Sequence, residues 1–192
     1  MRDLVRLPIR STQAGNRIGI HAHSYTDGDA SGDELWTRSP AGTGGVIAAT
    51  GSAVFLAGAR GGSAFVARWD ADGNEVWGLL FGVDGSSLWV QDIAADASGV
   101  YVTGHTFGAL TGQTHAGDID IFVRKYDLDG NVVWTDQFGT GGLDEGSGIT
   151  VNASGVYVTG RSEVLPRQTI KGHFLRPRSS RSSKQSVTCS TS

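Results

Sequence analysis

The chain has 192 residues, a formal net charge of −3, 29 glycines and one cysteine. The single Cys189 excludes an internal disulfide framework, and no stretch approaches the roughly 18 consecutive apolar residues of a membrane-spanning helix. Abundant glycine beside alternating Val, Thr, Tyr and Phe is typical of short strands joined by tight turns, so we predict an all-β protein with no membrane partner.

Residues 1–24 are predicted to form an irregular N-terminal segment. It contains basic residues but no continuous apolar run of about 7–15 residues, so no secretory signal is visible. His21 and His23 could present two imidazoles to a metal from one face of a strand, but no third ligand is evident nearby. We interpret them as a surface or chance pair.

Residues 25–63 are predicted to form one or more degenerate partial units of the repeat that follows. The segment from Tyr25 to Trp36 resembles the aromatic-to-Trp hairpin of the later copies, with extra residues in its turn. Residues 52–58 resemble one of the later strands.

The turn of that first hairpin is a weak candidate for a calcium site. Alternating oxygens and glycine can wrap a hard cation, and the candidate ligands here are Asp27, Asp29, Ser31 and Asp33. However, Arg38 stands where an EF-hand has Glu, and Leu35 stands where the nine-residue loop of some repeat proteins has Asp. We therefore favour a polar hairpin turn and keep calcium as the alternative.

Residues 64–163 contain the strongest signal, an internal repeat. Residues 64–77 recur with substitutions as residues 121–134, and residues 93–104 return as residues 149–160. Each unit divides into four predicted strands, separated by Asp-Gly-Asn turns and by Asp-Ala-Ser-Gly or Asn-Ala-Ser-Gly turns. Repeated units of four antiparallel strands are the signature of β-propeller blades.

The repeated motifs are Phe122-Val123-x-Lys125-Tyr126-Asp127, then Asp-Gly-Asn and Trp134, and the Asp-Ala-Ser-Gly and Val-Tyr-Val-Thr-Gly of residues 96–104. They resemble the bacterial β-propeller repeat known as the SBBP repeat, closely over residues 64–160 and loosely over residues 25–63. The resemblance implies propeller blades in an extracellular or cell-surface protein with no assigned reaction. Because propellers have about four to eight blades, we expect an incomplete ring, with the missing blades in a longer parent or in a second copy.

Residues 164–192 are predicted to be a disordered or out-of-register basic tail. Residues 1–160 carry nine Lys/Arg and 18 Asp/Glu, whereas residues 161–192 carry seven Lys/Arg and Glu163 alone. A disordered native tail, a basic nucleic-acid arm and a shifted or truncated reading frame compete as interpretations. We favour the last, because the third strand of the next unit does not follow residues 164–172, and we predict no nucleic-acid partner.

Aspartates and tryptophans recur in the units. Asp70 and Asp127 begin predicted turns, which we favour over metal ligation for them and for the nearby Asp72 and Asp129. Trp36, Trp77 and Trp134 are predicted core anchors between neighbouring units. Quinoprotein dehydrogenases look similar in having Trp at the end of the last strand of each blade, but the cofactor ligands and catalytic Asp of that site are not identifiable here. An exposed Trp89 could serve a binding surface.

No Ser-His-Asp order, phosphate-binding loop or Cys/His cluster is visible. We therefore predict a non-catalytic β-propeller module, a fragment, that acts as a structural scaffold or as a binding surface for a protein or glycan. Loops such as residues 105–120 are the expected place of binding. The alternatives are a quinoprotein-like oxidoreductase fragment and a calcium-binding propeller module. We predict no cofactor, with calcium as the alternative.

Overall fold

The computed structural model describes residues 17–21, 24–28, 34–38, 43–51, 53–83 and 85–163. These residues form antiparallel strands and turns, with no helix among them, so the predicted all-β class is confirmed. Within this part of the chain no helix has the length and apolar character that crossing a membrane requires. The predicted tail, residues 164–192, lies outside the described residues.

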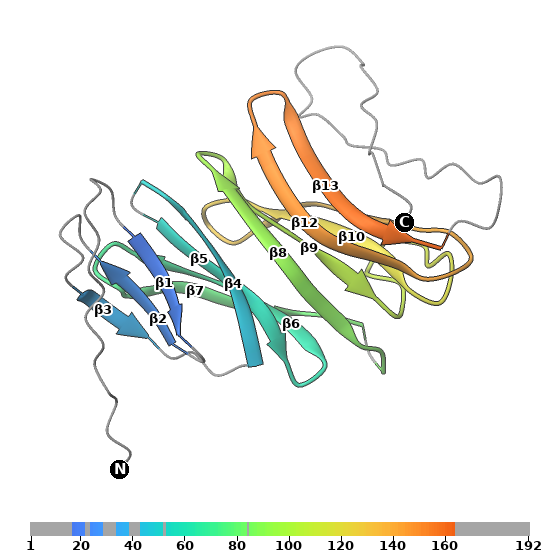
Figure 1. Ribbon diagram of the computed structural model, residues 1–192, viewed down its shortest axis with the longest axis horizontal. Coiled ribbons are helices and arrows are strands. Elements are labelled where there is room, and N and C mark those ends of the chain that lie inside the picture. Colours follow the sequence, from blue (N-terminus) through green and yellow to red (C-terminus); the bar gives the residue numbers. More distant parts are fainter. Residues whose placement is uncertain are drawn as a thin grey trace.

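The described strands fall into four antiparallel sheets (Figure 1). A three-stranded sheet consists of β1 (Arg17–His21), β2 (Ser24–Gly28) and β3 (Glu34–Arg38). The first meander, in which each strand pairs with the next, consists of β4 (Thr43–Thr50), β5 (Ala53–Arg60), β6 (Ser63–Asp70) and β7 (Glu75–Phe81). The second meander consists of β8 (Leu88–Asp96), β9 (Gly99–Thr106), β10 (Asp120–Tyr126) and β11 (Val132–Phe138). The remaining hairpin consists of β12 (Asp144–Asn152) and β13 (Gly155–Ser162).

The sheets divide the chain differently from the predicted boundary between residues 63 and 64. Strand β5 pairs with β6 along its whole length, from Ala53 opposite Asp70 to Arg60 opposite Ser63, so both sides of that boundary belong to one sheet. Residues 43–60 therefore form the first half of a four-stranded meander. Strand β4 carries little of the later motif, yet Val46 and Ile47 pack into the cores on opposite faces of the sheet, and this alternation is enough to make a strand.

The turns of the β6–β7 and β10–β11 hairpins have the same hydrogen bonds. Asp70 Oδ1 accepts hydrogen bonds from the main-chain nitrogens of Asp72 (3.0 Å) and Asn74 (2.8 Å), and Asp70 Oδ2 accepts one from the Asn74 side chain (3.0 Å). Asp127 repeats all three bonds in the second meander. Gly73 has a φ of 74°, in the left-handed region that favours glycine. The structure thus uses both aspartates to close turns, as the sequence predicted.

The sheets pack face to face, and apolar cores lie between them. The core between the two meanders includes Phe55, Val66, Val102, Phe122 and Tyr126. The core between the second meander and the β12–β13 hairpin includes Tyr101, Ile121, Val123, Ile149 and Val158. On the other face of the first meander a smaller cluster contains Leu56, Phe65 and Trp69. Stacking of the sheets, rather than any single sheet, therefore buries most of the apolar side chains.

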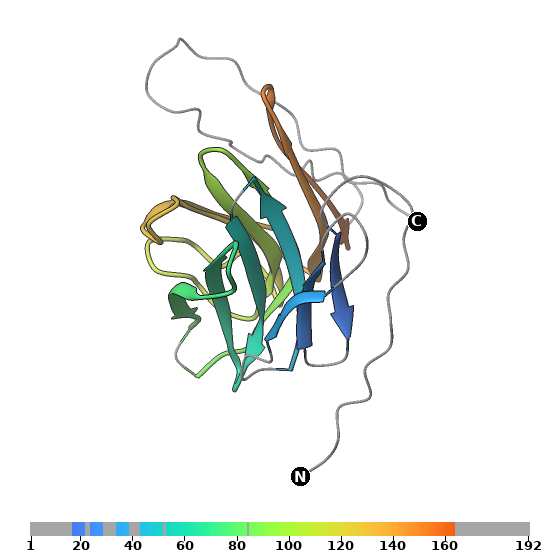
Figure 2. The same ribbon diagram turned by 90° about the vertical axis from the view of Figure 1, so that its left-hand side faces the viewer.

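The first strands of successive units lie side by side. Strand β8 lies between β4 and β12, as Figure 1 shows. Asp92 Oδ2 on β8 accepts a 2.7 Å hydrogen bond from the main-chain nitrogen of Ile149 on β12, which joins two of these strands. Seen from the side in Figure 2, the sheets fan around these strands, and the described residues do not close into a ring.

Candidate functional site

The predicted calcium loop of Asp27, Asp29, Ser31 and Asp33 is placed only in part. Asp27 lies in β2, opposite Ile18 of β1 and Trp36 of β3. The other three candidate ligands lie outside the described residues. This calcium site therefore stays a prediction.

Trp77 anchors the first meander to the second. Its indole Nε1 donates a 2.9 Å hydrogen bond to the main-chain carbonyl of Leu128, and its ring packs against Phe55 (6.2 Å between centroids) and Tyr126 (6.3 Å). The Arg68 guanidinium donates to the same carbonyl at 2.9 Å. These contacts agree with the predicted role of Trp77 as a core anchor between neighbouring units.

An exposed aromatic patch lies near the start of β8 and the end of β9. We define it as Trp89, His105 and Phe107. Trp89 is 50% exposed and Phe107 is 44% exposed. Trp89 stands opposite His105 in the β8–β9 ladder, and the rings of His105 and Phe107 meet at 6.1 Å between centroids. Neighbouring exposed aromatic side chains are typical of a surface that receives a ligand.

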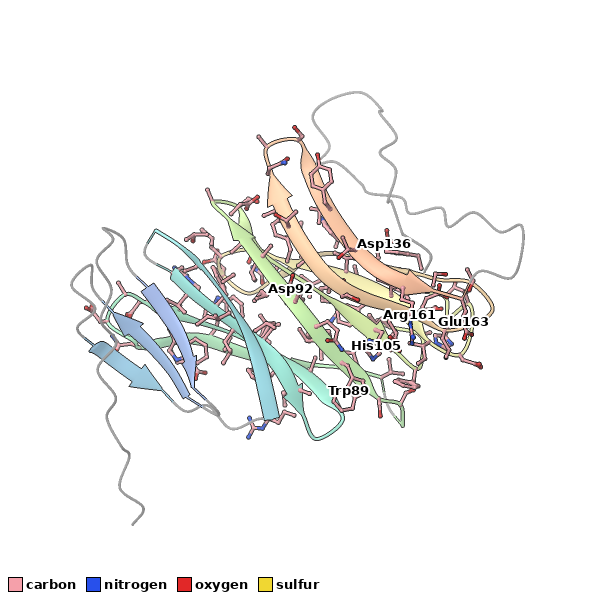
Figure 3. The ribbon with its side chains drawn as sticks, in the orientation of Figure 1. Trp89, Asp92, His105, Asp136, Arg161 and Glu163 are labelled. Carbon is pink, nitrogen blue, oxygen red and sulfur yellow. The ribbon has the colours of Figure 1, made fainter. Side chains whose placement is uncertain are left out.

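Charged groups of both signs border the aromatic patch. Glu145 of β12 and Arg161 of β13 form a salt bridge of 3.2 Å. Burial lowers the pKa of His105 below its usual value, and the nearby charge of Glu145 opposes this shift only partly. At pH 7 the imidazole is therefore neutral and can both donate and accept a hydrogen bond. In Figure 3 the labelled side chains of Trp89, His105 and Arg161 follow one another across β8, β9 and β13.

The loop of residues 107–119, which joins β9 to β10, is fastened by two buried polar side chains. Asp120 is fully buried, and its Oδ2 accepts hydrogen bonds from the main-chain nitrogen of Ala116 (2.8 Å) and from Gln137 Nε2 (2.9 Å). Gln137 Oε1 accepts a bond of 2.9 Å from the main-chain nitrogen of Leu110. These bonds place the predicted binding loop firmly against the end of the second meander.

A second fully buried carboxylate, Asp144, begins β12. Its Oδ2 accepts hydrogen bonds from the main-chain nitrogen (2.6 Å) and hydroxyl (2.9 Å) of Thr140. Ser162 stands opposite Asp144 in the β12–β13 ladder and is 9% exposed. The Oδ1 atoms of Asp120 and Asp144 and the Oγ of Ser162 are buried and form no hydrogen bond within the described part of the chain.

Gly139 brings the two carboxylates together. A Cβ placed on Gly139 would meet Asp120 Oδ1 and would lie 2.9 Å from Asp144 Oδ2. Both carboxylates therefore approach the same point, and any side chain at residue 139 would displace one of them. We call Asp120 and Asp144 the buried carboxylate pair.

Sequence reasoning missed this pair, although the repeat contains a signal for it. In the preceding unit Ser63 stands in the place of Asp120, and Leu88 stands in the place of Asp144. Two positions that are neutral in one unit are thus acidic in the next, which a comparison of the copies position by position reveals.

The buried carboxylate pair is smaller than the acidic or histidine clusters of many metal sites. No group of three or more His, Cys, Asp or Glu side chains that could hold a metal ion occurs among the residues that the structure describes. A scan of the chain against protein-family models gave no match, and no curated protein matched it.

Proposed function

We propose that the chain is a β-propeller-type repeat module with a non-catalytic role, a scaffold that carries a binding surface. The two meanders are then successive blades. Their four strands in chain order, their face-to-face packing and the adjacent strands β4, β8 and β12 support this assignment. The SBBP-like motifs support it independently and favour a cell-surface or secreted location.

The aromatic patch is the observation that carries the binding role. The half-exposed indole of Trp89 offers a flat apolar face, and His105 beside it can donate or accept a hydrogen bond. Glu145 and Arg161 add an acceptor and donors at the border of the patch. A sugar ring presents an apolar C–H face and an edge of hydroxyl groups, so this combination fits a glycan better than a purely apolar ligand.

A glycan array tests this role with the full chain, labelled at its N-terminus. We expect Trp89→Ala to weaken binding of the retained glycans by about tenfold or more, because an aromatic residue at the centre of a contact carries much of its free energy. Val133, which is 52% exposed on β11, provides the control: Val133→Ala should leave binding unchanged. Absence of any retained glycan, or equal binding by the Trp89→Ala variant, contradicts the proposal.

The oxidoreductase alternative is not favoured by any contact in the described residues. The recurring Trp that suggested it is explained at Trp77 by the hydrogen bond to Leu128 between the two meanders. Reconstitution with a quinone and a dye-linked assay tests the non-catalytic role, which any turnover would overturn.

The incomplete ring belongs to the same proposal. Tyr157 of β13 is 43% exposed, whereas Tyr101, its counterpart in β9, is 5% exposed. We propose that further blades, from a longer parent or from a second copy, cover the β12–β13 hairpin. Multi-angle light scattering tests the second copy as the source, because a dimer mass supports it and a monomer mass contradicts it.

A further inference from the structure

Among the residues that the structure describes, no cationic side chain balances the buried carboxylate pair. Asp120 and Asp144 are both 0% exposed, and neither forms an ion pair with any described residue. Two carboxylates that approach one point in a buried site are stabilised by a nearby cation, because their desolvation and mutual repulsion are costly. The pair therefore calls for a cation.

The unused oxygens favour a metal cation. Each carboxylate uses Oδ2 to hold a neighbouring loop and leaves Oδ1 without a hydrogen bond. The Ser162 hydroxyl is also without a partner, and it stands opposite Asp144, where side chains of paired strands share one face of the sheet. These three unused oxygens are the ligand type that calcium prefers.

The junction between the first and second meanders shows that the fold itself does not require charge at this place. There the equivalents of the carboxylates are Ser63 of β6 and the buried Leu88 of β8, and the turn between β5 and β6 consists only of Gly61 and Gly62. At the junction of the second meander and the β12–β13 hairpin the carboxylates occur together with the long loop 107–119, which Asp120 fastens. The two acidic residues and the long loop therefore occur together at one junction, and both are absent from the equivalent junction.

We propose that Asp120, Asp144 and Ser162 form a calcium site at the junction of the second meander and the β12–β13 hairpin. Calcium takes about six to eight oxygen ligands, so main-chain carbonyls and water complete the coordination. The ion neutralises the buried carboxylate pair and fixes loop 107–119, including Phe107 of the aromatic patch. This site is separate from the loop of Asp27, Asp29, Ser31 and Asp33.

The test compares the melting temperature of the full chain in EDTA with that in calcium chloride, and measures stoichiometry by isothermal titration calorimetry. At a hundredfold excess over Kd, calcium should raise Tm by about 5–10 °C. Asp120→Asn and Asp144→Asn should each abolish this shift, yet in EDTA they should melt no lower than the parent, because each removes repulsion between buried charges. Ser162→Ala should weaken calcium binding several-fold.

Asp27→Asn is the matched control and should keep the full response to calcium. Equal melting of the parent in calcium and EDTA overturns the proposal, as does a calcium response that persists in both asparagine variants. If calcium has no effect and Asp120→Asn alone raises Tm at pH 7, the proposal is wrong. These readouts do not involve a glycan, so failure of this site and failure of the aromatic patch remain distinguishable.

Discussion

The indole nitrogen of Trp77, on the last strand of the first meander, donates a 2.9 Å hydrogen bond to the main-chain carbonyl of Leu128 in the second. The bond spans the contact between two sheets, and the ring of Trp77 packs against Tyr126 of the second meander. Trp77 thus combines a polar and an apolar contact across the same junction.

Replacing Trp77 should destabilise the chain by disconnecting the two meanders. Trp77→Phe removes the hydrogen bond and part of the packing, so we expect a loss of about 1–2 kcal/mol in the free energy of unfolding. Urea denaturation measures this loss. Trp89→Phe is the matched control and should cost less than about 0.5 kcal/mol, because Trp89 is half exposed. Equal losses in the two variants would contradict the anchoring role.

Tyr101 and Tyr157 occupy equivalent positions with different surroundings. Tyr101 is 5% exposed, and its hydroxyl donates a 3.0 Å hydrogen bond to Asp96, whereas Tyr157 is 43% exposed. We expect Tyr101→Ala to cost about 3–5 kcal/mol and Tyr157→Ala less than about 1 kcal/mol. The comparison uses urea denaturation of dilute samples. A large loss in the Tyr157 variant would show that this face is covered.

The repeat made Trp77 and the turn aspartates predictable, because each depends on residues close in sequence or on a contact between consecutive units. Asp70 accepts hydrogen bonds from residues two and four positions later, so the local motif contains the whole turn. The buried carboxylate pair was not predictable in the same way. Asp120 and Asp144 belong to different sheets, and only the packing of these sheets brings them to Gly139.

The predicted boundary between residues 63 and 64 follows the repeated motifs, and the sheets follow a different signal. The repeat was read from the motifs of β6 to β9, whereas the sheets follow the hydrogen bonds that β4 and β5 make with β6. The alternation of apolar residues in β4 is a weaker signal for a strand of the sheet than a repeated motif is.

Asp127 should stabilise its turn only when it is ionised. Hydrogen bonds from the side chain and main chain of Asn131 lower the pKa of Asp127 from 3.8, so its contribution is present above pH 3.8 and is lost as the pH falls through the lowered value. Asp127→Ala should therefore reduce Tm at pH 7 and have little effect near pH 2. Asp129→Ala is the control, because only the main chain of Asp129 takes part in these bonds. A loss that is independent of pH would contradict the prediction.

His105 should make the chain less stable in mild acid. Burial lowers its pKa in the folded state from 6.5, with Glu145 opposing the shift, so below pH 6.5 the unfolded chain takes up more protons. Stability is thus highest above pH 6.5 and falls until the pH reaches the lowered pKa. His105→Gln should flatten the dependence of Tm on pH between about 5 and 7. An unchanged slope would contradict the prediction and show that groups other than His105 cause it.

The central claim is that the two meanders stack face to face as successive units, and nuclear Overhauser effects between aromatic protons test it most directly. The ring of Phe81 in the first meander lies 5.8 Å from that of Phe122 and 6.1 Å from that of Tyr126, both in the second, measured between centroids. The structure predicts cross-peaks from Phe81 to both rings. Cross-peaks confined to residues within each meander would contradict the stacked arrangement.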